Sequence, residues 1–276
     1  MDAPDPRVLR LAYEPLDLAT LSEHLHVSPS LERIELTWCR LGPEHAALLS
    51  TREAPTLAVR ALVLDHNDLG DEGVEALCAG AWPALEALSL ARCGVTARGF
   101  RRLAASPLAS RLRELSVDFN ELGADVADHL SAFSRLEVLT LRETEVGDDA
   151  VLALAQLPLR VLNLEGNGLT SRAVTGLSGA PVAGTLEQLL LNDNELDDDG
   201  LEVLLRALNP DRLRWLSLAG NPFSDEAVVA LSRAPSLAGL DVLEVEVSDD
   251  AHETFARSPV LRLEVVEHAL AGTIPG

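Results

Sequence analysis

One repeated pattern runs along almost the whole sequence and limits the possible folds more than any other feature. In each copy, apolar residues occupy the first, fourth, sixth and eleventh positions, and asparagine or cysteine often occupies the ninth. Clear copies begin at Val59, Leu112, Leu159, Leu186 and Leu213; diverged copies begin at Leu31, Leu85, Leu136 and Leu237; degenerate copies begin at Val8 and Val260. Another leucine falls 18 residues after the first position in eight copies, from Leu49 to Leu231, and Phe255 takes that place in the ninth. A shared register of this kind is typical of stacked repeat coils.

Each copy predicts one strand followed by one helix. Alternation of apolar and polar residues through the motif is typical of a strand with one buried face, and segments such as 69–81 and 196–208 have helical periodicity. A single coil cannot bury its own apolar strand residues, so neighbouring coils must share a core. We therefore expect one domain over 1–276, with an N-terminal capping coil (1–30), about nine full coils (31–259) and a C-terminal capping coil (260–276).

This pattern resembles the leucine-rich repeat family, and the pairing of one strand with one helix resembles its ribonuclease-inhibitor-like subfamily. The resemblance covers nearly the entire chain. It implies an α/β solenoid shaped like a horseshoe, with a parallel sheet on the concave face and helices on the convex face. The family's members are mostly protein-recognition modules, so the resemblance also implies that this chain binds a protein.

Three polar columns have structural interpretations. Asparagine at the ninth position is expected to hydrogen-bond backbone groups of its own turn and of the next coil. The second position alternates between glutamate and arginine from Glu32 to Arg214, which predicts a ladder of ion pairs along strands about 4.8 Å apart. Acids just after the eleventh position are expected to cap the helices that follow them. These acids are Asp71, Glu72, Asp125, Asp148, Asp149, Asp197, Asp198, Asp199, Asp225, Glu226, Asp249 and Asp250.

The sequence gives little basis for catalysis or for a bound cofactor. It contains no H-E-x-x-H, no G-x-S-x-G and no phosphate-binding loop. Cys39, Cys78 and Cys93 lie in different coils without a C-x-x-C, so we expect them to be structural. The acids of 192–200 lack the register of a calcium-binding EF-hand loop. We therefore expect a protein that is not an enzyme and that has no cofactor and no metal.

Charge narrows the kind of partner. The chain has 44 acidic residues against 22 basic ones and a net charge of −22, which disfavours binding to nucleic acid or to an anionic membrane and favours a basic protein surface. The N-terminus lacks the positive charge of a signal peptide, and no apolar run reaches 18 residues, so we expect a cytoplasmic protein. All 22 basic residues are arginine, which, with abundant alanine, favours a GC-rich bacterial source. A monomer is favoured.

Outward strand positions predict where a partner binds. The third, fifth, seventh and eighth positions of each motif point away from the core, because strand residues alternate between faces. Aromatic side chains surrounded by charge are typical of interface hot spots. The predicted partner-binding residues are Trp38, Asp65, His66, Asp118, Phe119, Arg142, Glu165 and Trp215. In the alternative interpretation, Trp38 and Phe119 fold over the end of the sheet and only shield the core.

Three functions fit these features. The favoured one is a non-enzymatic scaffold or inhibitor that binds a protein on an acidic concave face with aromatic residues. A regulator similar to the GTPase-activating members of the subfamily and a host-directed bacterial effector are the alternatives.

Overall fold

The computed structural model describes residues 5–27, 30–51, 58–248, 254, 257–258 and 264–266. The chain divides into two compact units, unit 1 (Met1–Val146) and unit 2 (Gly147–Gly276). The predicted helix-column residue Phe255, the predicted caps Asp249 and Asp250, and Val260 lie outside the described residues. The single-domain organisation stays a prediction.

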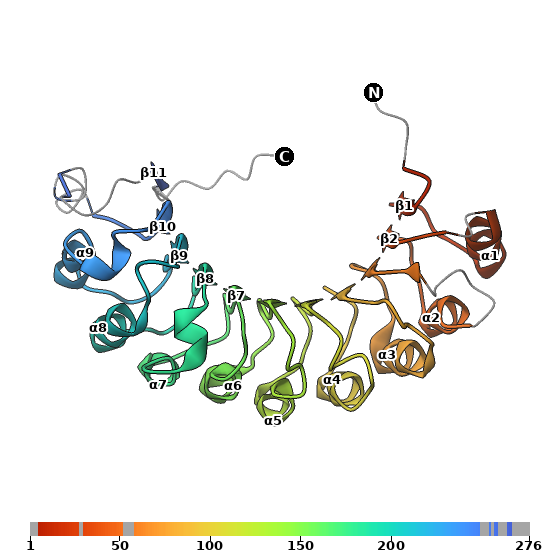
Figure 1. Ribbon diagram of the computed structural model, residues 1–276, viewed down its shortest axis with the longest axis horizontal. Helices are drawn as coiled ribbons and strands as arrows, with labels where there is room; N and C mark the ends of the chain where they lie inside the picture. Colours follow the sequence, from red (N-terminus) through yellow and green to blue (C-terminus); the bar gives the residue numbers. More distant parts are fainter. Residues whose placement is uncertain are drawn as a thin grey trace. The chain divides into compact units, whose positions relative to one another are not determined.

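Unit 1 repeats a strand followed by a helical segment. Its elements are β1 (Val8–Ala12), α1 (Leu18–Val27), β2 (Arg33–Thr37), α2 (Pro43–Leu49), β3 (Ala61–Val63), α3 (Gly70–Ala79), β4 (Ala87–Ser89), α4 (Ala97–Ala104), β5 (Glu114–Ser116), the 3₁₀ turn η2 (Ala124–Val126), α5 (Ala127–Leu130) and β6 (Val138–Thr140). The strands pair in parallel, each with the next along the chain. Within this unit the strands line the inner side of the curve and the helices its outer side (Figure 1).

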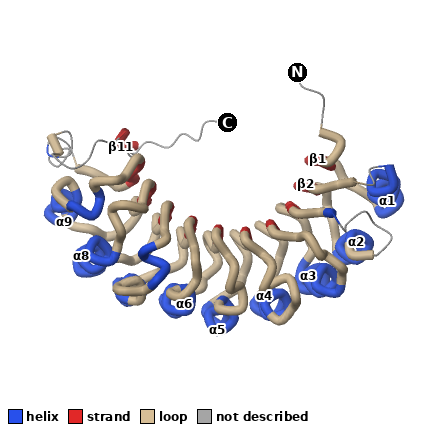
Figure 2. The backbone as a smooth tube through the Cα atoms, viewed as in Figure 1, coloured by secondary structure: helices blue, strands red, loops and turns tan. Residues whose placement is uncertain are grey.

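Unit 2 repeats the same arrangement. Its elements are α6 (Gly147–Leu154), β7 (Val161–Asn163), α7 (Ser171–Thr175), the 3₁₀ turn η3 (Pro181–Gly184), β8 (Gln188–Leu190), α8 (Asp198–Ala207), β9 (Trp215–Ser217), α9 (Asp225–Leu231), the 3₁₀ turn η4 (Pro235–Leu237), β10 (Val242–Glu244) and β11 (Glu264–Val266). Its strands are also parallel and paired in chain order. Figure 2 shows the short strands on one side of each coil and the helices on the other.

The predicted leucine columns form the core of both units. The strand residues Leu62 and Leu64 are 1% and 0% exposed, and their counterparts in neighbouring coils are equally buried. The leucine column of the helical segments, from Leu49 to Leu231, is buried in all eight coils where the sequence placed it. Because each coil buries its apolar residues against the coils before and after it, the α/β leucine-rich repeat solenoid predicted from the sequence is confirmed.

The strand register corrects the start predicted for the first coil. Leu9 pairs with Ile34 and Ala12 with Thr37, so the first motif begins at Pro6 and not at Val8. The pairing turns Leu9 and Leu11 toward the core side and leaves Val8 in an outward column. An end coil has a neighbour on one side only, so its apolar pattern tolerates more than one register.

The start predicted for the last full coil was also wrong. Leu243 pairs with Leu216, a fourth-position residue, so this motif begins at Leu240 and not at Leu237. Leucines spaced by three fit both registers, and strand pairing selects the one that buries Leu243 and Val245. By the same pairing β11 belongs to a motif that begins at position 262 and not at Val260.

The asparagine column closes the turns, but it serves a different coil from the one predicted. The side-chain oxygen of Asn67 accepts hydrogen bonds from the backbone N–H groups of Cys39 and Leu41, both at 3.0 Å, and its amide donates to the carbonyls of Leu36 and Leu64 at 2.7 and 2.8 Å. Cys39, Leu41 and Leu36 belong to the preceding coil. Asn120 and Asn194 repeat the pattern. The predicted hydrogen bond to the following coil is therefore wrong. The asparagine side chain points toward the turn of the preceding coil and bonds the backbone groups there.

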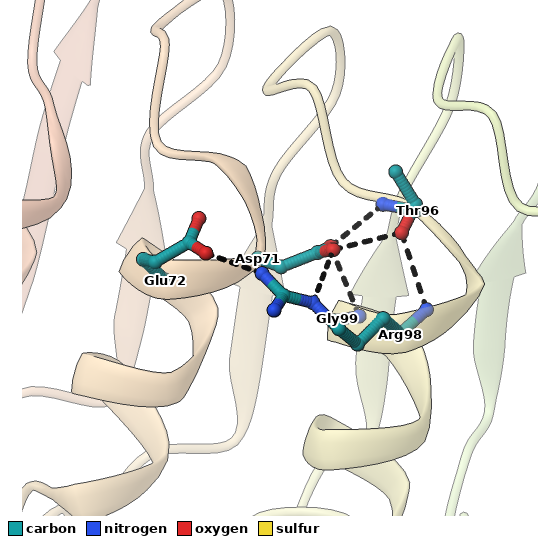
Figure 3. A network of polar contacts seen from close by, with 5 residues as sticks. All are labelled: Asp71, Glu72, Thr96, Arg98 and Gly99. Atoms are coloured by element: carbon teal, nitrogen blue, oxygen red, sulfur yellow. Dashed lines mark hydrogen bonds and ion pairs between the residues drawn. The ribbon is translucent and has the colours of Figure 1, made fainter.

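The acid column likewise connects coils. Asp71 lies in the first turn of α3, yet its carboxylate accepts from the backbone N–H groups of Thr96 and Gly99, both at 2.9 Å, and from the Thr96 hydroxyl at 2.8 Å. Figure 3 shows these bonds together with the Arg98 guanidinium, which pairs with both Asp71 and Glu72. Asp71 therefore caps the next helix, α4, and not its own.

Other acids of this column divide between two roles. Asp148 accepts from the N–H and hydroxyl of Thr170 in the next coil, at 2.8 and 2.7 Å. Asp197 caps its own helix, α8, through the Gly200 N–H at 2.9 Å, as the sequence predicted. The capping interpretation is right for Asp197, and it names the wrong helix for Asp71 and Asp148.

Replacing Asp71 with asparagine is expected to lower the free energy of unfolding by about 1–3 kcal/mol near neutral pH. Burial opposes ionisation of Asp71, but the hydrogen bonds from Thr96, Arg98 and Gly99 outweigh it and lower the pKa of this carboxyl below its ordinary value of 3.8. A lowered folded-state pKa gives a contribution that is complete above the unfolded pKa and is lost as pH falls through the folded one. Urea unfolding of both proteins between pH 7 and 2.5 checks this. A stability difference that stays constant down to pH 2.5 contradicts the assignment.

The charged second-position column forms ion pairs between neighbouring coils. In each observed pair the arginine contacts the glutamate of the next coil. These pairs are Arg7 with Glu32, Arg60 with Glu86, Arg113 with Glu137 and Arg160 with Glu187. Most of these side chains are exposed, so each pair contributes about 0–1 kcal/mol and mainly favours the observed register.

Candidate functional site

A row of side chains at the C-terminal ends of the unit 1 strands occupies the eighth motif position. We call Tyr13, Trp38, His66, Arg92 and Phe119 the rim stripe. Their φ angles are 63°, 58°, 59°, 52° and 56°, all in the left-handed region. The backbone turns there while each N–H still donates to the seventh-position carbonyl of the next coil, as from Phe119 to Arg142 at 2.7 Å.

This left-handed conformation costs a residue with a side chain about 1–2 kcal/mol. In unit 2 the same column contains Gly166 and Gly220, whose φ angles of 67° and 69° are unstrained for glycine, and between them Asp193, whose φ of 53° is strained. Unit 1 instead holds bulky aromatic and charged residues at these positions. Backbone strain that the fold does not require is a marker of functional sites.

The rim stripe contains two groups of stacked flat side chains. The Trp38 and His66 ring centroids are 4.1 Å apart with planes 13° from parallel, and the Tyr13 ring lies 6.3 Å from Trp38 at 16°. Further along, the guanidinium carbon of Arg92 is 4.0 Å from the centre of the Phe119 ring, and that of Arg142 is 5.1 Å from it. The spacing of neighbouring strands, about 4.8 Å, places flat groups at stacking distance.

The two predicted aromatic anchors, Trp38 and Phe119, differ in how much of each side chain is exposed to solvent. Trp38 is 49% exposed and Tyr13 is 79% exposed, so neither is tucked beneath the leucine layer. Phe119 is half-buried between two guanidiniums. Both Trp38 and Phe119 lie in the column that the sequence predicted for them, on the same side of unit 1.

Asp65 and Asp118 have structural contacts that the sequence did not reveal. The Asp65 carboxylate accepts from the Ser89 hydroxyl at 2.6 Å and from the Ala91 N–H at 2.9 Å. The Asp118 carboxylate accepts from the Arg142 N–H at 2.8 Å. Burial raises the pKa of Asp118, and the bond from Arg142 opposes that rise. Both acids therefore connect neighbouring strands of the sheet.

Six of the eight predicted partner-binding residues lie in unit 1, and Glu165 and Trp215 lie in unit 2. Glu165 is 9% exposed, so its expected place on an open surface is wrong. Trp215 is half-buried in β9, and its indole N–H has no hydrogen-bond partner among the described residues.

A pocket beside the stripe contains residues that the sequence analysis missed. It has a volume of about 440 Å³ and is lined by Tyr13, Pro15, Trp38, Arg40, His66 and Asp68. Tyr13 was missed because starting the first motif at Val8 placed it in an inward column. The signal was present, since Leu9, Leu11 and Leu16 fit the fourth, sixth and eleventh positions of a motif starting at Pro6.

A second, open hollow lies on the sheet of unit 1. Its volume is about 320 Å³, and small residues such as Ala87, Ser89 and Ser116 form part of its lining. Glu114 and Asp65 supply acidic groups and Arg33 a basic one. The hollow forms because these coils carry small side chains at outward positions.

The charge of the unit 1 sheet face differs from the expected acidic surface. Outward positions there hold the acids Glu35, Asp65, Glu114, Asp118 and Glu143 together with the arginines Arg10, Arg33, Arg92 and Arg142. Glu35 pairs with both Arg10 and Arg33. Further acids lie instead in the loops that follow the strands, which include Asp68, Glu121 and Glu145.

The remaining chemical groups suit structural roles. Cys39 and Cys93 are buried, and burial raises the pKa of the Cys93 thiol to about 12, which suppresses the reactive thiolate. Among the described residues, no cluster of three or more His, Cys, Asp or Glu side chains is arranged to hold a metal ion. No helix in the described part of the chain has the length and apolar character needed to cross a membrane.

Comparisons with known proteins agree with this repeat architecture. The family model for the leucine-rich repeat matches residues 59–78 and 185–205. The chain contains leucine-rich repeats. It is 32% identical over 247 residues to the ribonuclease inhibitor of Sus scrofa, covering 80% of this chain and 54% of that protein. The chain thus spans just over half the length of this relative.

Solved structures show the same fold. A chain of the yeast Rad7 and Elc1 complex matches with a TM-score of 0.63 and 17% identity, over 93% of this chain and 68% of that one. An internalin from Listeria monocytogenes matches with a TM-score of 0.56 and 17% identity, over 95% of this chain and 82% of that one. At these identities the likeness concerns the fold alone.

Proposed function

We propose that this chain is a non-enzymatic scaffold or inhibitor that binds a protein partner through the rim stripe of unit 1. One observation carries the proposal: Tyr13 and Trp38 are exposed, and they stand in an unbroken row of strained left-handed residues, whereas unit 2 has glycine at two positions of the same column. Exposed aromatic rings held rigidly by stacking supply contact area with little loss of conformational freedom, as interface hot spots do. Similarity to a protein named ribonuclease inhibitor supports an interaction role.

The partner is proposed to have a basic surface. The chain's net charge of −22 would accelerate association with a cationic protein and would oppose binding to nucleic acid. Because the sheet face of unit 1 has both signs of charge, the acidic loops beside the rim stripe are the groups proposed to meet basic residues. We also propose that the protein is monomeric, cytoplasmic and bacterial, and that it belongs to the ribonuclease-inhibitor-like subfamily.

Affinity capture with the full chain at about 50 and 500 mM salt, followed by mass spectrometry, tests this function. The partner is expected to be captured at low salt and largely lost at high salt, since screening weakens contacts between exposed charges. Phe119→Ala is expected to lower capture at least fivefold, because the ring against which Arg92 and Arg142 stack is removed and the stripe loses its fixed shape.

Leu152→Ala is the matched control, since Leu152 is an exposed apolar residue (41%) on α6, a helix of unit 2 that contributes no residue to the rim stripe. Its capture is expected to equal that of the unmodified chain. If Phe119→Ala captures every partner as well as Leu152→Ala does, binding does not use the stripe and the proposal fails.

A further inference from the structure

The pocket at the N-terminal end of the rim stripe combines aromatic rings with a carboxylate. Tyr13, Trp38 and His66 stack side by side, and Asp68 lines the same pocket. Tyr13 and Trp38 are the most exposed large hydrophobic residues in the described part of this unit. Arg40 also lines the pocket, so both signs of charge are present.

The other end of the stripe shows which group this geometry accommodates. There, the Arg92 guanidinium lies 4.0 Å from the centre of the Phe119 ring, and Arg142 approaches the same ring at 5.1 Å. A guanidinium is planar, always charged and weakly hydrated, so it stacks on aromatic faces at the spacing of neighbouring coils. The protein therefore fills one part of the stripe with its own arginines, while the rings at the other end remain open to solvent.

The charges around the open rings indicate which kind of group binds there. In the lining itself Asp68 balances Arg40, and the exposed acids Glu14 and Asp17, which follow Tyr13 in the chain, make this segment acidic. A cation that stacks on Trp38 and pairs with Asp68 satisfies both the rings and the carboxylate. A lysine ammonium is compact and strongly hydrated, so it would gain less from the rings.

We infer that this pocket binds an arginine side chain of the partner, with the guanidinium against Trp38 and Tyr13 and paired with Asp68. The inference rests on the proposed function and names the chemical group that the rim stripe recognises. Arg40 opposes the incoming charge and so limits the affinity.

Titrating the full chain with N-acetyl-arginine methylamide tests this pocket without knowledge of the partner. The readout is the indole N–H signal of Trp38 in ¹⁵N-correlated spectra, assigned with Trp38→Phe. The buried indole of Trp82, which donates to the Leu77 carbonyl at 2.9 Å, is the internal reference. The Trp38 signal is expected to shift saturably with a Kd in the millimolar range, while the Trp82 signal stays in place.

Two variants of opposite charge make the test specific. Asp68→Asn is expected to weaken arginine binding at least fivefold, and Arg40→Ala is expected to strengthen it about two- to fivefold. The lysine, phenylalanine and glutamate analogues are expected to bind at least threefold more weakly than arginine. The inference is overturned if the phenylalanine or glutamate analogue binds as tightly, if Arg40→Ala abolishes binding, or if arginine leaves the Trp38 signal unmoved.

These outcomes are separate from those of the proposed function. A protein whose capture depends on Phe119, combined with no response to the arginine analogue, would remove only the arginine pocket. Capture that is independent of the stripe would remove the proposed function, whatever the analogue does.

Discussion

Replacing Asn120 with alanine is expected to lower the free energy of unfolding by about 3–5 kcal/mol. The Asn120 side chain is 3% exposed, and its oxygen accepts from the N–H groups of Cys93 and Val95 at 3.1 and 2.9 Å. Its amide donates to the carbonyls of Leu90 and Val117 at 2.8 and 2.9 Å. Alanine leaves these four backbone groups without their partner inside the stack, and each unsatisfied buried group costs about 1–3 kcal/mol before water enters.

Asn120→Cys is the matched comparison, because the chain uses cysteine in the same column. The Cys93 thiol donates to the Leu64 carbonyl at 3.1 Å, the bond that corresponds to the one from Asn120 to Leu90. A thiol replaces this donor but not the oxygen that accepts two N–H groups, so we expect about half the loss seen with alanine. Urea unfolding followed by circular dichroism measures both. An alanine variant within 1 kcal/mol of the original chain would show that the turns are held by other contacts.

The repeat made the fold predictable in the middle of the chain and less so at its ends. Leu62 and Leu64 have partners on both sides, so only one register buries them. Leu9 and Leu243 lie near the ends, where fewer neighbouring strands constrain the motif, and there the sequence-based start was wrong. Tyr13 was lost from the predicted site for this reason alone.

The rim stripe was only partly predictable for a different reason. Alternation along a strand placed Trp38 and Phe119 outward, and strand spacing made them members of one column. How their neighbours are oriented depends on the left-handed turn at the eighth position, which the residue types of unit 1 do not indicate because bulky side chains occupy it there. The hydrogen bonds that hold Asp65 and Asp118 arise from the next strand, so their structural role could not be inferred from their own coils.

Replacing Trp38 with alanine is expected to weaken the partner's binding about 30- to 100-fold, which corresponds to about 2–3 kcal/mol. Trp38 contacts both neighbours in the stripe, His66 at 4.1 Å and Tyr13 at 6.3 Å between ring centroids. Its loss therefore removes an exposed anchor and also leaves two flat side chains without a stacking partner. Surface plasmon resonance with the captured partner at fixed salt measures the change.

The same substitution is expected to leave stability nearly unchanged, within about 1 kcal/mol, because half of the Trp38 side chain is already in solvent and alanine accepts the φ of 58° at the same strain. Trp38→Phe tests whether an aromatic ring is enough at this position. It keeps an aromatic ring against His66, and we expect it to retain most of the affinity. If Trp38→Ala unfolds at a clearly lower urea concentration, or if it binds like the original chain, then Trp38 covers the end of the sheet and is not an anchor for a partner.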